Sequence, residues 1–133
     1  MKYLIDTHVL LWALFDDDRL TSRAESVIRN PDNDIYASTI SYWEISLKYA
    51  VGKLELYGVT PEELLFHAKN TGIETINISE NVVSTFYKLP RTAHKDPFDR
   101  LIIWQAINEN ITMISKDEKM PEYQKYGLKI LWK

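Results

Sequence analysis

Short apolar segments alternate with longer helix-like segments along almost the whole chain, and this alternation limits the fold more than any other feature. The strand-like segments are residues 3–5, 35–37, 73–78, 111–114 and 129–132. Strands that alternate with helices are joined by right-handed crossovers and form a mostly parallel sheet with helices on both faces. The sequence therefore predicts an α/β fold in three layers, α/β/α, with a central sheet of four to five strands.

The helices expected between these strands begin at recognisable capping residues. Thr60, Pro61 and Glu63 form a capping box with proline at the first helical position, and Gly72 ends that helix. Asp96 and Pro97 open a later helix in a similar way. The remaining helices are expected at about residues 9–15, 22–29, 39–51 and 79–89.

The size and composition indicate one domain, residues 1–133. A chain of 133 residues with 45% hydrophobic content can bury one core and is too short for two ordinary domains. Cysteine is absent, and the three histidines have no paired spacing that suits zinc. Any bound metal is therefore expected to have oxygen ligands.

Charge and hydropathy narrow the function classes. The formal net charge of −3 argues against a protein that binds nucleic acid by bulk electrostatics alone, although an enzyme with a metal-filled acidic pocket can use a local basic rim. Residues 1–6 lead directly into a strand without an export signal, and the apolar run 9–15 is too short to cross a membrane. We expect a cytoplasmic protein that does not bind membranes.

Four carboxylates follow the predicted strands or lie in the first turns of the helices after them: Asp6, Glu44, Asp99 and Asp117. The carboxyl ends of parallel strands meet at one edge of a sheet, so these side chains are expected to share a pocket. Each close pair of like charges costs roughly 1 to 4 kcal/mol unless a counter-charge is present. Oxygen ligands of this kind suit Mg²⁺ or Mn²⁺.

Each acid also has a structural explanation. Asp6 can cap the helix that follows it, and Glu44 can form a capping box with Ser41. Asp99 is favourable in the first turn of a helix, and Asp117 can end a turn. Capping does not require the acids to converge, however, and a carboxylate with two oxygens can cap a helix and bind a metal together.

Four segments in this order resemble the PIN-domain ribonucleases and, more narrowly, the VapC toxins of bacterial type II VapBC toxin–antitoxin pairs. The matching segments are residues 3–8, 41–45, 94–102 and 114–117. The most specific is the string His94-Lys95-Asp96-Pro97-Phe98-Asp99-Arg100. The resemblance covers essentially the whole chain in order and spacing.

This resemblance implies a metal-dependent endoribonuclease that uses Mg²⁺ or Mn²⁺. Its acidic quartet, which serves as both metal ligands and catalytic residues, matches Asp6, Glu44, Asp99 and Asp117. Asp96 matches a further acid expected behind the direct ligands, and Thr7 matches a hydroxyl position beside the first acid. The implied partners are an RNA substrate and a VapB-like antitoxin that blocks the pocket.

Basic residues near the expected pocket are candidates for binding RNA phosphates. Lys48, Arg100 and Lys116 are the main ones, and for each of them a solvated surface charge is the alternative interpretation. Arg100 can instead neutralise the acids, since it directly follows Asp99. His8 and His94 are interpreted as structural or helix-end residues, because a metal would make a histidine base unnecessary.

Two other functional interpretations remain open. A PIN-like module without catalysis would serve only as a binding partner. A phosphorelay receiver also has an acidic magnesium pocket, but it needs an acidic pair after its first strand and a phosphoacceptor aspartate after a middle strand; here Asp6 stands alone and residues 76–78 contain no acid. Four tryptophans and eight tyrosines favour a homodimer or an antitoxin-binding surface.

Overall fold

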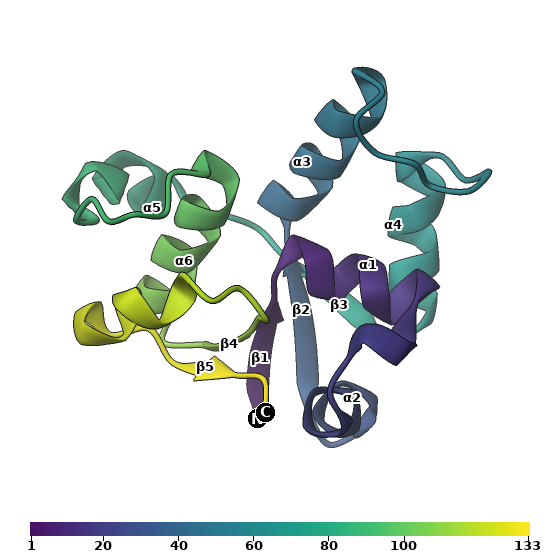
Figure 1. Cartoon of the computed structure of the whole chain (residues 1–133), viewed down its shortest axis with the longest axis horizontal. Coiled ribbons are helices and arrows are strands. Elements are labelled where there is room, and N and C mark those ends of the chain that lie inside the picture. Colours follow the sequence, from purple (N-terminus) through teal and green to yellow (C-terminus); the bar gives the residue numbers. More distant parts are fainter.

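The computed structural model describes residues 1–133 and contains one sheet of five strands, all of them parallel. The strand order is β3-β2-β1-β4-β5. The strands are β1 (Lys2–Ile5), β2 (Asp34–Ser38), β3 (Ile73–Ile76), β4 (Thr112–Ile114) and β5 (Ile130–Leu131). The predicted parallel α/β architecture is confirmed (Figure 1).

Helices fill the connections between the strands. They are α1 (Thr7–Phe15), α2 (Ser22–Arg29), α3 (Thr39–Ala50), α4 (Pro61–Asn70), α5 (Glu80–Thr85) and α6 (Pro97–Glu109). Short 3-10 helices lie at Asp17–Arg19, Phe86–Lys88 and Met120–Tyr126. A loop was expected at the first of these, and no helix was predicted at the last. The predicted capping box of Thr60 and Glu63 is present at the start of α4.

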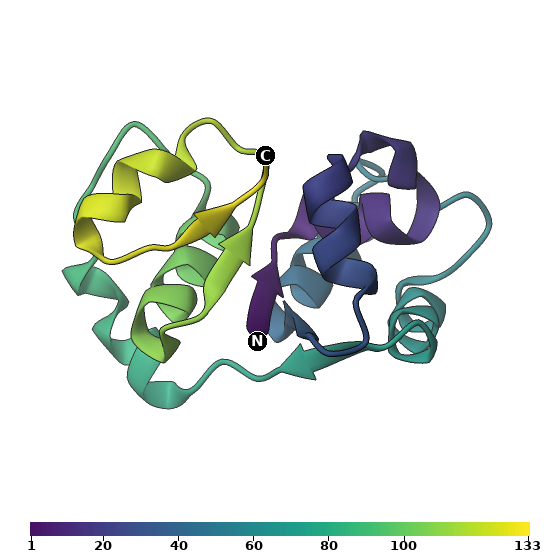
Figure 2. The same ribbon diagram turned by 90° about the horizontal axis from the view of Figure 1, so that it is seen from below.

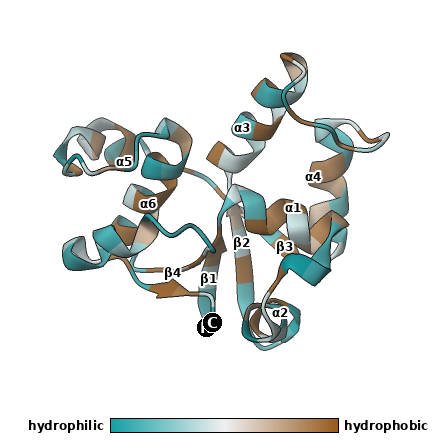
Figure 3. Cartoon of the chain, viewed as in Figure 1, coloured by the Kyte–Doolittle hydropathy of each residue, from teal (hydrophilic) through white to brown (hydrophobic).

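Two hydrophobic cores lie on opposite faces of the sheet. Ile5 belongs to the core under α1, α2, α3 and α4, whereas its neighbour Leu4 belongs to the core under α6 and the 3-10 helix Met120–Tyr126. Successive side chains of a strand point to opposite faces, so one strand supplies both cores. The two groups of helices lie on either side of the sheet in Figure 1, and Figure 3 shows hydrophobic residues in β1, β4 and β5.

The order of the strands reverses beside β1. The chain runs from β1 outward to β2 and β3, and β4 then pairs with the other edge of β1. In Figure 2, β1 lies between the α1, α2 and α4 side and the side formed by β4, β5 and α6. The main-chain N–H of Asp6 donates to Ile114 O at 3.2 Å, which joins the carboxyl ends of β1 and β4. Ligand sites of open α/β sheets occur at such a reversal.

The start of α3 at Thr39 agrees with the prediction, but the residue that caps it does not. Ser38, at the end of β2, is the N-cap, and its hydroxyl accepts a hydrogen bond from Ile40 N at 3.1 Å. Ser41 therefore lies inside the helix, and the predicted capping box of Ser41 and Glu44 is wrong. The helix begins directly after the strand, so Glu44 lies beyond the capping positions. Its side chain is buried in the pocket.

No helix combines the length and the apolar character that crossing a membrane requires.

Candidate active site

Asp6 lies at the carboxyl end of β1 and caps α1. Its Oδ1 accepts a hydrogen bond from Val9 N at 2.8 Å, and its Oδ2 accepts one from Ser115 Oγ at 2.6 Å. The side chain is buried, and burial raises the pKa of Asp6 although both hydrogen bonds act in the opposite direction. Two hydrogen bonds thus fix the Asp6 carboxylate at a buried position, where its negative charge is poorly solvated.

Glu44 is buried on α3 and joins the pocket to α1. Its Oε1 accepts a hydrogen bond from Thr7 Oγ1 at 2.7 Å, and Thr7 Oγ1 also lies 2.9 Å from Ser41 Oγ. Its Oε2 forms a 2.5 Å ion pair with Lys48 Nζ, one helical turn further along α3. The Thr7 hydroxyl therefore fixes one carboxylate oxygen and the Lys48 ammonium fixes the other.

Lys48 is the cation that forms an ion pair with an acid of the pocket, Glu44. Burial alone would lower the pKa of Lys48, but its hydrogen bond to Glu44 and the negative charges of Glu44, Asp96 and Asp99 raise it above the usual value. Lys48 therefore remains charged and neutralises part of the pocket.

The surroundings of the Asp99 carboxylate strongly raise its pKa. It lies in the first turn of α6, which Asp96 caps by accepting hydrogen bonds from Phe98 N at 2.9 Å and Asp99 N at 3.2 Å. Burial raises the pKa of Asp99 to about 8, and the nearby charges of Asp96, Asp6, Glu44 and Asp117 act in the same direction. The four predicted acids therefore lie within electrostatic reach of one another.

Asp117 lies in the loop after β4, and His94 holds it against Asp99. Nε2 of His94 is 2.8 Å from Oδ2 of Asp117 and 3.4 Å from Oδ2 of Asp99. The other oxygen of Asp117 accepts a hydrogen bond from Lys119 N at 2.9 Å, and Asp117 N donates to Ser115 Oγ at 3.1 Å. Ser115 thus contacts both Asp6 and the main chain of Asp117.

A cavity of about 320 Å³ opens from these acids along α1 and the loop after β4. Its lining residues are Asp6, His8, Trp12, Lys116, Asp117 and Glu118. Nζ of Lys116 lies 5.8 Å from the centre of the Trp12 ring, on the wall of the cavity. Asp6 and Asp117 therefore face a space that the exposed Lys116 also lines.

Arg100 occupies a different environment. Its guanidinium donates to Leu89 O at 3.1 Å and to Pro90 O at 3.2 Å, and it lies 5.1 Å from the centre of the Phe86 ring. These contacts fasten the segment before α6 to the helix. The prediction that Arg100 binds phosphate remains untested, and the contacts give it a structural role instead.

The contacts of Ser115 and His94 with the acids were not predicted. Ser115 directly follows β4, and that position at the carboxyl edge of the sheet was the available signal. His94 was interpreted as structural, whereas its ring contacts two acids of the pocket. The contacts of Ser115 with Asp6 and of His94 with Asp117 do not follow from local sequence, because the partners are 109 and 23 residues apart.

The residues of the pocket fit a divalent cation with oxygen ligands. Asp6, Glu44 and Asp99 are buried carboxylates, and the raised pKa values of Asp6 and Asp99 show that their charges lack sufficient compensation. A carboxylate oxygen of Asp99 lies within 4.8 Å of one of Asp117, close enough for both to face one cation. Mg²⁺ and Mn²⁺ prefer such hard oxygen donors, often with water completing the coordination.

The fold is that of a PIN domain. A sequence model of the PIN domain matches residues 3–126, so the chain belongs to the PIN-domain family. Among individual proteins it is similar to Ribonuclease VapC22 of Mycobacterium tuberculosis, with 26% identity over 121 residues that cover 91% of each chain. The resemblance predicted from the four sequence segments is therefore confirmed.

Solved structures with the same fold come from toxin–antitoxin complexes. VapBC2 from Rickettsia felis, bound to a DNA fragment from its promoter, matches with a TM-score of 0.68 and 20% identity over 100% of both chains. VapBC-1 from nontypeable Haemophilus influenzae matches with a TM-score of 0.68 and 19% identity, covering 98% of this chain and 97% of the other. At these identities the comparison establishes the shared fold.

Proposed function

We propose that this protein is a Mg²⁺- or Mn²⁺-dependent endoribonuclease and the toxin of a toxin–antitoxin pair. The observation that carries the proposal is the convergence of Asp6, Glu44, Asp99 and Asp117 from separate elements on one largely buried pocket. The family and the similarity to a protein named a ribonuclease add support.

Asp6 and Asp99 would hold the cation directly, and Glu44 and Asp117 would complete the site or orient water. When bound, a divalent cation supplies positive charge to the scissile phosphate and makes an attacking water more acidic. No nucleophilic side chain is then required for hydrolysis of a phosphodiester bond.

The surrounding residues hold these carboxylates in place. Ser115 orients Asp6, Thr7 orients Glu44, and the Asp96 cap fixes the turn of α6 that carries Asp99. Lys48 offsets part of the negative charge, which lowers the repulsion that an RNA phosphate meets at the pocket. Lys116, at the wall of the adjoining cavity, would contact the next phosphate of the RNA chain.

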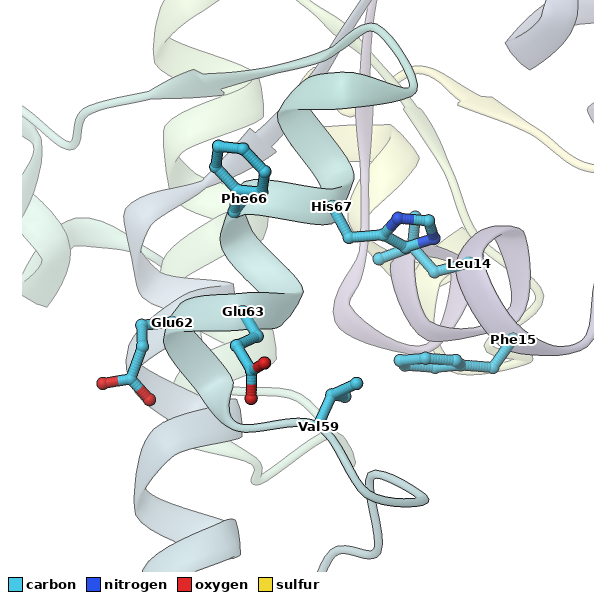
Figure 4. A pocket seen from close by; sticks show the side chains of 7 residues that line it. All are labelled: Leu14, Phe15, Val59, Glu62, Glu63, Phe66 and His67. Carbon is cyan, nitrogen blue, oxygen red and sulfur yellow. The ribbon is translucent and has the colours of Figure 1, made fainter.

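The proposed partner is a VapB-type antitoxin, as in the named complexes. A groove of about 470 Å³ between α1 and α4 is lined by Leu14, Phe15, Val59, Glu62, Glu63, Phe66 and His67 (Figure 4). Phe66 is 68% exposed, and the two glutamates add negative charge beside it. This surface suits a partner segment with apolar and basic side chains. The exposed Trp43 and Leu47 on α3 provide a second apolar surface, for the antitoxin or for a homodimer.

The direct test is incubation of the purified protein with total RNA, with Mg²⁺, with Mn²⁺ and with a chelator. Cleavage is expected only with a metal. Cleavage that persists in chelator would contradict the proposal. Metal binding without any cleavage would favour the catalytically inactive PIN-like module.

A further inference from the structure

The His94 ring is held in one orientation. The side chain is only 5% exposed, and its ring centre lies 6.5 Å from that of the fully buried Tyr123. The main-chain N–H of His94 donates a hydrogen bond to Thr92 Oγ1 at 3.1 Å. Thr92 Oγ1 in turn donates one to the Tyr123 hydroxyl at 2.7 Å. The segment before α6 therefore presents this imidazole to the pocket as a fixed group.

The contacts of the ring identify the nitrogen that carries its proton. Nδ1 lies 3.4 Å from the main-chain N–H of Asp96, which can only donate, so Nδ1 is the acceptor. The proton of a neutral imidazole is then on Nε2, the nitrogen 2.8 Å from Asp117 Oδ2 and 3.4 Å from Asp99 Oδ2. His94 thus donates a hydrogen bond to Asp117, while a carboxylate oxygen of Asp99 lies near the same ring nitrogen.

Asp117 has a greater need of such support than the other acids. Asp6 caps a helix, and Glu44 and Asp99 lie on helices, whereas Asp117 lies on the loop after β4 with a side chain that is 29% exposed. The side-chain contacts of Asp117 that orient its two oxygens are those from Lys119 N and His94 Nε2. Removal of the His94 donor would leave one oxygen of Asp117 without a fixed direction.

From these contacts we infer that His94 is a positioning residue that holds Asp117 beside Asp99 in the arrangement the metal site requires. The inference rests on the proposed metal-dependent function. His94 acts through the two acids and does not bind the metal itself. A ligated Nε2 would need the ring proton on Nδ1, where it would face the N–H of Asp96, with two donors opposed.

Two substitutions at this residue separate positioning from packing. The amide nitrogen of glutamine reaches the position of Nε2, whereas asparagine reaches only that of Nδ1. His94→Asn is expected to weaken Mn²⁺ binding about 10- to 100-fold, the usual effect of losing a residue that orients a metal ligand. His94→Gln is expected to restore the affinity to within a few-fold, and Tyr87→Asn, which replaces a ring that is 79% exposed, is the control.

The measurements are the Mn²⁺ dissociation constant from the electron paramagnetic resonance of free Mn²⁺, the melting temperature in chelator, and the rate of RNA cleavage. Unchanged Mn²⁺ affinity in His94→Asn, or equal loss of affinity in both His94 variants, would overturn the positioning role. The electron spin-echo spectrum of the Mn²⁺-loaded wild type tests the inference whether or not the variants fold. A signal from an imidazole nitrogen bonded directly to Mn²⁺ would overturn the inference, and a loaded site without that signal would support it. Failure of the wild type to bind Mn²⁺ would overturn the proposed function itself and so is a distinct result.

Discussion

The Ser115 hydroxyl donates a 2.6 Å hydrogen bond to Oδ2 of Asp6, across the boundary between β4 and β1. The same hydroxyl oxygen accepts a hydrogen bond from Asp117 N at 3.1 Å. One small side chain therefore sets the relative positions of the first and last acids of the pocket. This relationship exists because the strand order reverses beside β1 and brings two distant parts of the chain together.

Ser115→Ala should weaken the site without changing its charge. Loss of a donor to a buried carboxylate is expected to lower the free energy of unfolding by about 1 to 3 kcal/mol. The Mn²⁺ affinity should fall about 10-fold or more, because Asp6 loses its orientation. Chemical denaturation in chelator and a Mn²⁺ titration measure the two effects, with Ser46→Ala on the exposed side of α3 as the control. Wild-type values in both assays would remove Ser115 from the site.

Asp6→Asn should abolish RNA cleavage and leave the fold intact. The asparagine oxygen can still cap α1 by accepting from Val9 N, so the melting temperature in chelator is expected to stay near or above that of the wild type. Cleavage should fall by roughly two to three orders of magnitude, because a charged ligand is lost. Asp18→Asn, at an exposed acid, is the control for contaminating nucleases. A variant that cuts RNA at the wild-type rate would exclude Asp6 from catalysis.

The stability of the metal-free protein should depend on pH through Asp99. Its folded-state pKa of about 8 is above the ordinary value of 3.8, so the folded protein binds a proton more tightly than the unfolded chain does. The stability that this group contributes is complete below about pH 4 and is lost as the pH rises to about 8, at up to about 1.4 kcal/mol per pH unit.

Asp99→Asn should remove the part of the pH dependence that comes from Asp99, while the part from Asp6, whose pKa is also raised, should remain. In chelator the variant is expected to be more stable than the wild type at about pH 8.5 and to differ less at about pH 5, as measured by chemical denaturation. A wild-type protein whose stability does not fall over that interval would contradict the raised pKa. Because the metal competes with the proton on Asp99, Mn²⁺ binding at neutral pH should also release about one proton, which calorimetry in buffers of different ionisation enthalpy can count.

Lys48→Met should destabilise the metal-free protein more than the metal-bound one. Methionine keeps the apolar part of the side chain but leaves the carboxylate of Glu44, which is 2% exposed, without its cation. The expected loss in chelator is about 1 to 3 kcal/mol, since Lys48 itself is partly solvated. Saturating Mn²⁺ should recover part of that loss by supplying another positive charge. Lys53→Met, at an exposed lysine, is the control, and an identical loss with and without Mn²⁺ would separate Glu44 from the metal site.

The sequence alone determined the order of the elements, the parallel sheet and the acids at its carboxyl edge. These features follow from local rules: apolar periodicity distinguishes strands from helices, and capping residues such as Asp6, Thr60 and Asp96 mark where helices begin. Only the tertiary structure decided that Ser38 starts α3, that Arg100 contacts main-chain carbonyls, and that His94 and Ser115 orient the acids. The Ser38 cap is a local contact fixed by where β2 ends, whereas the other contacts depend on strand register and on side-chain packing between separate segments, which no local pattern encodes.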